Sequence, residues 1–257
     1  MALTNESHHQ QVQFWTKVRI EQLLPEKCPA DDCSARCAIC LSDMRGEQCG
    51  DVDNGDGAVV QLSLCSHLFH QQCIKLAFAV KRQCPLCMLW YGECIGNQPA
   101  NATMLVLHVP GRAGRDHGSR LTDHGNHGAL VPGHVPGHSD AKGFHEIVYH
   151  VPSGTQKDGH VRPGHRYASA TRYAYLPNNA EGTRVLKLLQ LAFVRRLIFT
   201  IGDSVTTGRK NVPVWNGIHH KTSKRGGPRN YGYPDPTYLE RVTSELSMLG
   251  VRSEQLN

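Results

Sequence analysis

The sequence contains no long apolar run. Its longest apolar stretches, such as residues 197–201, fall far short of the roughly 20 residues that a membrane-spanning helix needs. The polar residues at its start also lack the apolar core of a secretory signal. These absences predict an intracellular protein, cytoplasmic and/or nuclear, with no membrane partner.

A strong net charge is missing as well. The chain carries a formal charge of +6, from 28 lysines and arginines against 22 aspartates and glutamates. That excess is too small to predict nucleic-acid binding by itself. One basic cluster leaves two interpretations open, a solvated loop or a surface for acidic partners such as nucleic acid. The cluster consists of Lys221, Lys224, Arg225 and Arg229.

Cysteine, by contrast, is plentiful, with 10 in the chain. Six cysteines and two histidines follow the spacing Cys-x2-Cys, Cys-x-His-x2-His-x2-Cys, Cys-x2-Cys between residues 37 and 87. Paired ligands of this kind suffice for two closed tetrahedral sites, and zinc suits thiolate and imidazole ligands. Four protein ligands leave no position for a catalytic water, so both zinc ions are expected to be structural. The predicted ligands are Cys37, Cys40, Cys65, His67, His70, Cys73, Cys84 and Cys87.

Chain length and composition favour two modest domains. With 257 residues, 39% of them hydrophobic, the chain can bury a core in each. We predict a lead-in over residues 1–35, a zinc-bound domain over 36–92 and a second domain over 93–257. Within the lead-in, residues 11–24 are expected to form a short helix that ends at Pro25.

The second domain is expected to combine strands and helices. Residues 104–109 and 144–151 have the composition of strands, and we expect them to pair. Between them, the Gly-, His- and Pro-rich residues 111–142 cannot build a core, which predicts a flexible insertion. Further along, residues 181–196 have helical spacing and lead directly into a buried strand at 197–201.

The last element is expected to be an amphipathic helix. Asp235 can serve as its N-cap and Pro236 as its first residue. Glu245 lies at the border of the buried stripe and Glu240 points nearly opposite to it, so Glu245 can line a pocket while Glu240 faces water. The buried stripe consists of Leu239, Val242, Leu246 and Leu249.

The zinc-ligand string resembles a RING finger with two histidines. The resemblance implies interleaved sites in a cross-brace: one zinc ion is held by Cys37, Cys40, His70 and Cys73, the other by Cys65, His67, Cys84 and Cys87. RING fingers recruit a ubiquitin-conjugating enzyme charged with ubiquitin. The positions that match their contact surface are Ile39, Pro85 and Leu86. The residue after the last ligand, often a cation that grips ubiquitin, is Met88.

Several strings beyond the zinc ligands resemble the Deltex family over about residues 36 to 250. They include YG at 91–92, GNQP at 96–99, PSGTQ at 152–156, YLPNNAEG at 175–182, TTG at 206–208, WNGIHHKT at 215–222 and GYPDPTYL at 232–239. The resemblance implies an α+β fold, in which a RING precedes a Deltex C-terminal domain with an antiparallel-rich sheet. It also implies a ubiquitin ligase, linked to Notch signalling, whose second domain binds ADP-ribose or NAD. Ubiquitin would be directed onto ADP-ribose, ADP-ribosylated proteins and nucleic-acid ends.

The Deltex resemblance also implies a ligand pocket. Its residues, carried over by position, are Ser204, Thr206, Thr207, Gly208, Trp215 and His219. A glycine-containing turn exposes backbone N–H groups that suit phosphate oxygens, while indole and imidazole rings suit adenine or ribose faces. For Trp215, ordinary packing is the alternative. Since adjacent side chains diverge on a helix or a strand, one of the two histidines, His219 and His220, is expected in the pocket and the other in a structural role.

Glu245 matches the catalytic acid of the Deltex family. The implied role is general base towards a ribose hydroxyl, whereas a solvated glutamate at a helix border is the ordinary alternative. Tyr231 occupies a position where other members carry histidine or tyrosine, and it completes the expected catalytic pair. With an ordinary pKa near 10, tyrosine is a poor base at neutral pH, so proton removal would fall to Glu245.

Two other functions stay open at the level of sequence. One is a non-catalytic reader that binds ADP-ribosylated targets. The other is a conventional ligase that modifies protein lysines and uses its second domain only to recruit substrates. Both keep the zinc sites, and they differ from the main hypothesis in what Glu245 does.

Overall fold

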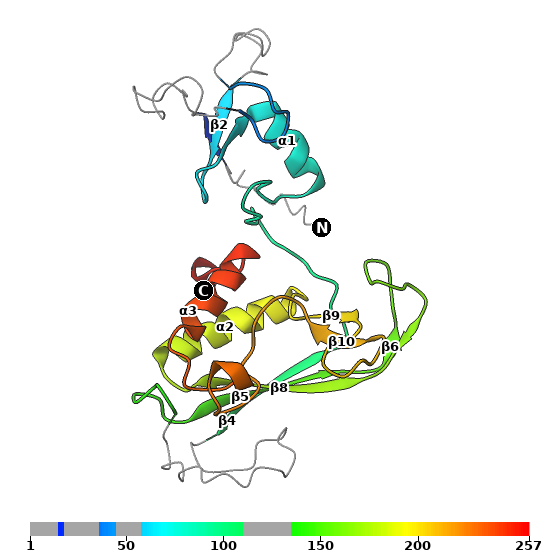
Figure 1. Cartoon of the computed structure of the whole chain (residues 1–257), viewed down its shortest axis with the longest axis vertical. Helices are drawn as coiled ribbons and strands as arrows, with labels where there is room; N and C mark the ends of the chain where they lie inside the picture. Colours follow the sequence, from blue (N-terminus) through cyan, green and yellow to red (C-terminus); the bar gives the residue numbers. More distant parts are fainter. Residues whose placement is uncertain (1–14, 18–35, 45–57, 110–134, 257) are drawn as a thin grey trace, which may run out of the picture. The chain divides into compact units, whose positions relative to one another are not determined.

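The computed structural model describes residues 15–17, 36–44, 58–109 and 135–256. The chain divides into two units, residues 1–92 and 93–257 (Figure 1). No helix within the described ranges is both long enough and apolar enough to cross a membrane.

The described part of the first unit consists of a small sheet and a helix. Strand β2 (Val59–Leu62) pairs antiparallel with β3 (Leu68–His70), and α1 (Gln71–Val80) follows directly. Its core is a single cluster that includes Val60, Leu62, Phe69, Ile74, Phe78 and Tyr91. A core of this size contributes little stability by itself, so metal ligands are the expected supplement.

The helix predicted within residues 11–24 is wrong where the structure can be compared with it. Trp15–Lys17 forms strand β1, which pairs antiparallel with β2, Trp15 lying opposite Leu62. The free edge of β2 offers backbone donors and acceptors that this segment satisfies. A partner so distant in sequence overrides the local helical spacing. The rest of the predicted helix lies outside the described residues.

The second unit is built on an antiparallel sheet in the order β4-β5-β8 (Figure 1). Its strands are β4 (Thr103–Val109), β5 (Phe144–Val151) and β8 (Ala170–Pro177). The predicted pairing of the first two strands is confirmed, and the central strand β5 is buried along most of its length. Two hairpins complete the set, β6 (Gly154–Thr155) with β7 (Arg166–Tyr167), and β9 (Phe199–Gly202) with β10 (Val212–Trp215). Every strand pair among the described residues is antiparallel, which confirms the predicted α+β class.

Helix α2 (Ala180–Val194) confirms the predicted helix that leads into a strand. It packs on the sheet through β8 and β5. Its N-cap is Asn179, whose side chain accepts a hydrogen bond from the Gly182 N–H at 2.8 Å. A Cβ at Gly182 would lie 2.0 Å from the carbonyl oxygen of Pro177, so only glycine allows the helix to start this close to β8. The helix ends where Arg196 adopts a left-handed conformation, with φ 61°.

Helix α3 (Tyr238–Met248) packs against α2 and buries the predicted stripe through Leu239, Val242 and Leu246. The predicted N-cap is wrong, because the helix begins three residues after Asp235 and its N-cap is Thr237. The Asp235 carboxylate instead accepts hydrogen bonds from Lys221 at 2.6 Å and Arg241 at 3.0 Å. Two charge-assisted bonds outcompete one capping bond for the same carboxylate. Short 3-10 turns precede and follow the helix, η3 (Pro228–Asn230) and η4 (Ser253–Gln255).

The predicted flexible insertion is too long at its C-terminal end. Val135 is fully buried, and the ring of His138 packs edge-on against Tyr233 with centroids 5.7 Å apart. Residues 135–142 therefore belong to the folded domain. Residues 111–134 of the predicted insertion lie outside the described residues.

Candidate functional site

The first predicted zinc quartet comes together in the first unit. The ligand atoms of Cys37, Cys40, His70 and Cys73 all lie within 4.8 Å of one another. His70 ends β3 and Cys73 follows it in the first turn of α1. The Nδ1 atom of His70 lies 3.3 Å from the Cys40 Sγ and 4.0 Å from the Cys73 Sγ, so this nitrogen faces the thiols.

The second predicted quartet is also assembled, from Cys65, His67, Cys84 and Cys87. Cys65 and His67 sit at the turn between β2 and β3, while Cys84 and Cys87 lie on a loop beyond α1. The Nδ1 atom of His67 is 3.2 Å from the Cys65 Sγ and 3.5 Å from the Cys84 Sγ. The two quartets alternate along the chain, which is the cross-braced arrangement that the RING resemblance implies.

The chemistry of both quartets fits zinc. Each offers three thiols and one imidazole within one shell, the donor set of a closed tetrahedral site. Burial raises the pKa of Cys73 and of Cys84 to about 12, so these thiols keep their protons until a cation replaces them. Zinc binding would therefore release protons and link the two chain segments that supply the ligands of each quartet.

Tyr91 supports the second quartet, a role that ligand spacing does not reveal. Its hydroxyl donates to the Cys65 Sγ at 3.2 Å and accepts the N–H groups of Leu64 and Cys65 at 3.1 Å. The side chain is fully buried and packs on Phe78. Outer contacts of this kind orient metal ligands. The sequence offered one signal for this role, which is that Tyr91 belongs to the YG string shortly after the last ligand.

The predicted docking residues for a conjugating enzyme are exposed. Ile39 lies between the ligands Cys37 and Cys40, and Pro85 and Leu86 lie between Cys84 and Cys87. Ile39 is 37% exposed and Leu86 52%. Each apolar side chain thus sits on a loop that one quartet holds in shape. Exposed apolar groups on rigid loops suit a protein partner.

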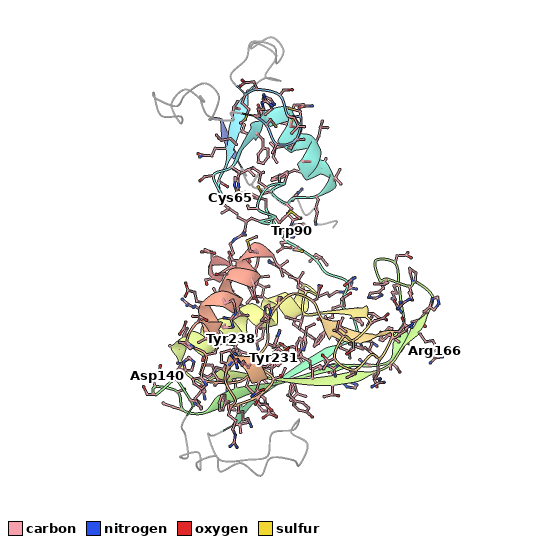
Figure 2. All side chains as sticks on the ribbon, in the orientation of Figure 1. Cys65, Trp90, Asp140, Arg166, Tyr231 and Tyr238 are labelled. Atoms are coloured by element: carbon pink, nitrogen blue, oxygen red, sulfur yellow. The ribbon has the colours of Figure 1, made fainter. Side chains whose placement is uncertain are left out.

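Glu245 and His219 are brought together in the second unit. The Glu245 Oε1 lies 2.6 Å from the His219 Nδ1, and its Oε2 accepts the His219 backbone N–H at 2.9 Å. The hydroxyl of Tyr238, labelled in Figure 2, donates to the His219 carbonyl at 3.2 Å. The carboxylate side chain is 20% exposed and the imidazole 66%. Helix α3 thus fixes an exposed imidazole in front of a half-buried carboxylate.

The neighbouring His220 has a structural role, as the sequence predicts for one of the pair. It is buried, with its Nε2 3.1 Å from the Tyr149 hydroxyl and its Nδ1 2.9 Å from the Ile218 carbonyl. Its ring stacks on Trp215 at 4.2 Å, and Trp215 stacks on Phe199 at 4.7 Å. The Trp215 ring therefore has a packing role, as the alternative interpretation of this residue expects. It is half-buried, so part of its surface stays accessible.

The burial of His220 predicts that the protein loses stability in mild acid. Burial lowers the pKa of His220 to about 4, below its ordinary value of about 6.5. Its stabilising effect is complete above pH 6.5 and is lost as the pH falls from 6.5 towards 4, because the unfolded chain binds the proton more readily. The shift corresponds to roughly 3 kcal/mol.

Urea unfolding of the wild type and of His220→Gln, measured between pH 7.5 and 4.5, tests this expectation. The variant should be less stable at neutral pH but should lose less stability on acidification. Equal slopes for the two proteins would contradict the assignment.

The four predicted pocket residues of the GDSVTTG turn lie on the loop between β9 and β10. The Ser204 N–H donates to the Arg209 carbonyl and the Gly208 N–H to the Ser204 carbonyl, both at 2.8 Å. Gly208 has φ +65°, which favours glycine in this tight turn. Thr206 and Thr207 are exposed. Trp215 ends β10, about 10 Å along the strand from the end that joins this turn.

Tyr231 makes no hydrogen bond or ion pair with Glu245 or His219 in the described part of the chain. It has a left-handed backbone, with φ 53°, and is 64% exposed. Its hydroxyl has no hydrogen-bond partner among the described residues. Of the two expected catalytic residues, Glu245 is thus a carboxylate held by hydrogen bonds, and Tyr231 is an exposed phenol.

Two of the four residues of the basic cluster, Lys221 and Lys224, do not belong to an accessible surface. The Lys221 Nζ lies 2.6 Å from Asp235 and the Lys224 Nζ 3.5 Å from Glu146, and both lysines are buried. Burial alone would raise the pKa of Asp235, but hydrogen bonds from Lys221 and Arg241 outweigh it and hold the pKa at about 2. Both open interpretations, a solvated loop and a nucleic-acid surface, are therefore wrong for these two lysines.

Comparison with known proteins finds two matching domain families and several similar proteins. The Deltex C-terminal domain profile matches residues 125–251 and the RING-H2 zinc finger domain profile matches residues 35–88. The chain is 41% identical over 225 residues to the human (Homo sapiens) protein named Probable E3 ubiquitin-protein ligase DTX3, covering 88% of this chain and 55% of that protein. It is 39% identical over 204 residues to E3 ubiquitin-protein ligase DTX1 of Xenopus laevis, covering 77% and 29%. The chain thus spans about half the length of the first relative and less of the second.

Proposed function

The chain belongs to the Deltex family, with a RING-H2 zinc finger ahead of a Deltex C-terminal domain, and we propose that it is a ubiquitin ligase that acts on ADP-ribose. Its RING would bind a conjugating enzyme charged with ubiquitin. Its second domain would bind ADP-ribose, NAD or an ADP-ribosylated protein and present a ribose hydroxyl as the acceptor. Ligase activity itself is supported by the names of the relatives, which are E3 ubiquitin-protein ligases.

The contact between Glu245 and His219 is the observation that carries this proposal. A carboxylate at the edge of a buried helix face is held by a backbone N–H at 2.9 Å and by an exposed imidazole at 2.6 Å. A carboxylate that merely faced water would need neither bond. A general base must be fixed within reach of the proton that it removes.

The expected ligand shape agrees with the positions of the pocket residues. The β9–β10 turn offers exposed hydroxyls and N–H groups, whereas Trp215 and His219 offer rings further along the chain. A ligand that reached both would have to be elongated, with polar groups towards the turn and a ring system towards Trp215 and His219. ADP-ribose and NAD have this form.

In the proposed mechanism, Glu245 takes the proton of the ribose hydroxyl. The hydroxyl oxygen attacks the carbonyl of the thioester between ubiquitin and the conjugating enzyme. A carbon–oxygen ester bond forms, the carbon–sulfur bond breaks, and the conjugating enzyme's sulfur leaves as a thiolate, which can take the proton back from Glu245. The His219 ring holds Glu245 in position, and orienting the two reactants can contribute roughly 7–11 kcal/mol.

Zinc would take no part in the bond changes. The quartets would hold the loops that carry Ile39, Pro85 and Leu86, so the metal shapes the docking surface. Closed sites with four protein ligands leave no open position on the ion.

Calorimetric titration with ADP-ribose tests the pocket. We expect saturable binding that Thr206→Val weakens, because the exchange removes an exposed hydroxyl and preserves shape. Trp215→Ala should weaken binding further, and its thermal unfolding midpoint must be recorded, since the ring also packs on His220. Absence of saturable binding in a folded wild-type protein would overturn the ADP-ribose assignment.

Met88 allows a gain-of-function test of the RING. It follows the last ligand and is 52% exposed. A cation at this place would reach ubiquitin, so Met88→Arg is expected to accelerate discharge of the charged conjugating enzyme by a few fold, the scale of one charge-assisted hydrogen bond at an exposed site. Met88→Gln, which adds polarity without charge, is the matched control. A rate unchanged by Met88→Arg would show that ubiquitin does not approach this position.

A further inference from the structure

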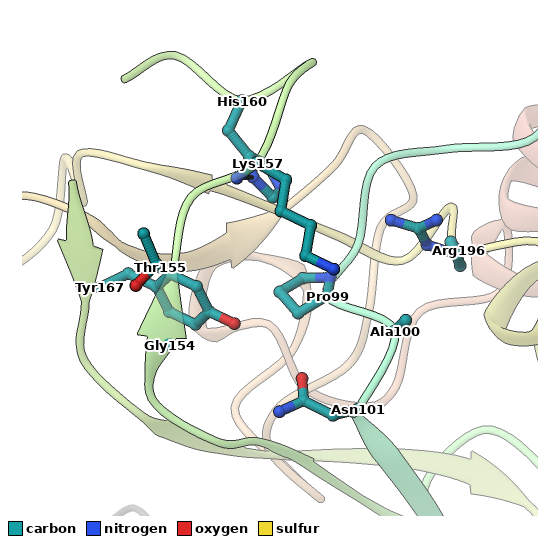
Figure 3. Close-up of a pocket in the computed structure, with 9 residues that line it drawn as sticks. All are labelled: Pro99, Ala100, Asn101, Gly154, Thr155, Lys157, His160, Tyr167 and Arg196. Atoms are coloured by element: carbon teal, nitrogen blue, oxygen red, sulfur yellow. Dashed lines mark hydrogen bonds between the residues drawn. The ribbon is translucent and has the colours of Figure 1, made fainter. Parts of the chain in front are cut away.

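A cavity lies in the C-terminal domain, and none of the residues assigned to ADP-ribose lines it. Its volume is about 360 Å³. One wall contains Pro99, the last residue of the GNQP string, and another contains Gly154 and Thr155 of the PSGTQ string. Neither string has a role in the proposed function. The lining residues are Pro99, Ala100, Asn101, Gly154, Thr155, Lys157, His160, Tyr167 and Arg196 (Figure 3).

The charge of the lining is positive and uncompensated. Lys157 and Arg196 contribute cations, and the lining contains no carboxylate. Among the described residues, the Lys157 ammonium has no hydrogen-bond or ion-pair partner. Arg196 uses only its Nε, which donates to the Gln98 carbonyl at 2.6 Å, and its two Nη groups have no partner in the same part of the chain. Two unpaired cations facing one cavity repel each other and favour an anion.

The segments that carry these cations are held in place. Arg196 has a left-handed backbone, with φ 61°, and its carbonyl accepts the Gln98 N–H at 3.2 Å. His160 accepts the Lys157 N–H through Nδ1 at 3.0 Å, so its Nε2 carries the proton and donates to the Asn97 carbonyl at 2.6 Å. A left-handed non-glycine residue costs of order 1–3 kcal/mol and persists where the surroundings enforce it. The cavity is therefore preorganised before any ligand binds.

Neutral donors and an apolar wall complete the cavity. Figure 3 shows the Tyr167 hydroxyl and the Asn101 amide directed into the space that Lys157 enters. Burial raises the pKa of Tyr167, so the hydroxyl keeps its proton as a donor. A Cβ at Gly154 would lie 2.6 Å from that hydroxyl oxygen, so glycine is what leaves room for it. Pro99 supplies apolar surface beside the donors.

We propose that this cavity binds the phosphate monoester group of a small organic ligand. A phosphate monoester carries a charge of about −1.5 to −2 at neutral pH, which matches two cations better than a carboxylate does. A guanidinium fork and an ammonium are the two side chains that most often bind phosphate. The apolar wall would hold the organic part. None of the residues assigned to ADP-ribose lines the cavity, so this site and the proposed ligase chemistry stand or fall separately.

Titration of the full chain with phenyl phosphate and with inorganic phosphate at constant ionic strength tests the proposal. We expect one saturable site, and Lys157→Gln should weaken phenyl phosphate binding at least about tenfold, because it removes a charge-assisted hydrogen bond. Lys187→Gln makes the same charge change at an exposed position of α2 outside the cavity and should have no effect. Tighter binding of phenyl phosphate than of inorganic phosphate would support an organic ligand, and equal binding would assign the site to free phosphate.

Three outcomes would overturn the phosphate site. The first is the absence of saturable binding. The second is equal weakening by Lys157→Gln and Lys187→Gln, which would indicate a general charge effect. The third is displacement of phenyl phosphate by ADP-ribose together with loss of both ligands in Thr206→Val, which would place the two ligands in one pocket. Loss of ADP-ribose binding alone would leave the phosphate site intact and count against the ligase proposal only.

Discussion

Ubiquitin transfer to ADP-ribose is expected to fall by about 10²–10⁴-fold in a Glu245→Ala variant, the usual contribution of a positioned general base. Binding of ADP-ribose should be largely retained, since the carboxylate acts on a proton in the transition state and need not bind the ligand. The two quantities can be measured on one protein. Formation of the ubiquitin–ADP-ribose adduct with a charged conjugating enzyme reports transfer, and calorimetry reports binding.

Two further variants show which group takes the proton. Glu240→Ala removes a carboxylate from the exposed side of the same helix and should leave transfer unchanged. His219→Ala should weaken ADP-ribose binding and reduce transfer less than Glu245→Ala, because it removes one of the two bonds that hold the carboxylate. If His219→Ala abolished transfer with binding intact, the imidazole would be the base and Glu245 would only orient it.

The same assay separates the two rival functions. A non-catalytic reader predicts unchanged activity and unchanged binding in Glu245→Ala. A conventional lysine ligase predicts transfer to lysine that is indifferent to added ADP-ribose, with no adduct. Loss of the adduct in Glu245→Ala, with lysine transfer preserved, is the result that supports the Deltex-type mechanism over both.

The parts of the fold that follow from short-range rules could be predicted from the sequence. Helix α2 has apolar residues at helical spacing and ends next to a β-rich run, and the structure places both elements where the pattern does. The zinc ligands have spacings that only a metal site explains well. In both cases the relevant residues are close in sequence, or their identity alone restricts the chemistry.

The errors share one physical cause, which is a contact that the local sequence pattern does not encode. Trp15–Lys17 pairs with β2 more than 40 residues later, so local periodicity misleads. The Asp235 carboxylate forms ion pairs with Lys221 and Arg241 and does not cap the helix N-terminus. Val135 is buried by the folded domain, although its neighbours in sequence have a low-complexity composition. The spacing of apolar and polar residues within a segment reveals none of these contacts.

The candidate site divides in the same way. The position of Glu245 at the border of a buried stripe follows from helical geometry, and its partial exposure agrees with that. Its hydrogen bonds to His219, 26 residues earlier, do not follow from any spacing. Lys221 and Lys224 of the basic cluster are not surface groups, because their carboxylate partners, Asp235 and Glu146, lie on other segments. Charge along a sequence shows which residues can pair, and only the fold shows which of them do.

Removal of zinc is expected to abolish transfer to every acceptor. The core of the first unit is one small cluster, and its members Cys37 and Cys84 are themselves ligands. Structural zinc contributes an apparent 10–16 kcal/mol in zinc-finger peptides, about as much as the whole stability of a small domain. Without the metal, the loops of Ile39 and Leu86 lose the clamps that hold them. Discharge of a charged conjugating enzyme should therefore stop after chelation and return when zinc is added back.

The second domain should survive the same treatment, which makes the zinc experiment specific. Its sheet and helices contain none of the eight ligands, so ADP-ribose binding is expected to persist in the chelated protein. A Cys84→Ser variant should reproduce the loss of discharge without a chelator. Cys94→Ser, at a buried cysteine of the second unit outside both quartets, should not. In the proposed function the RING holds the charged conjugating enzyme and the second domain holds the acceptor, so a zinc-free protein that still made the adduct would contradict that proposal.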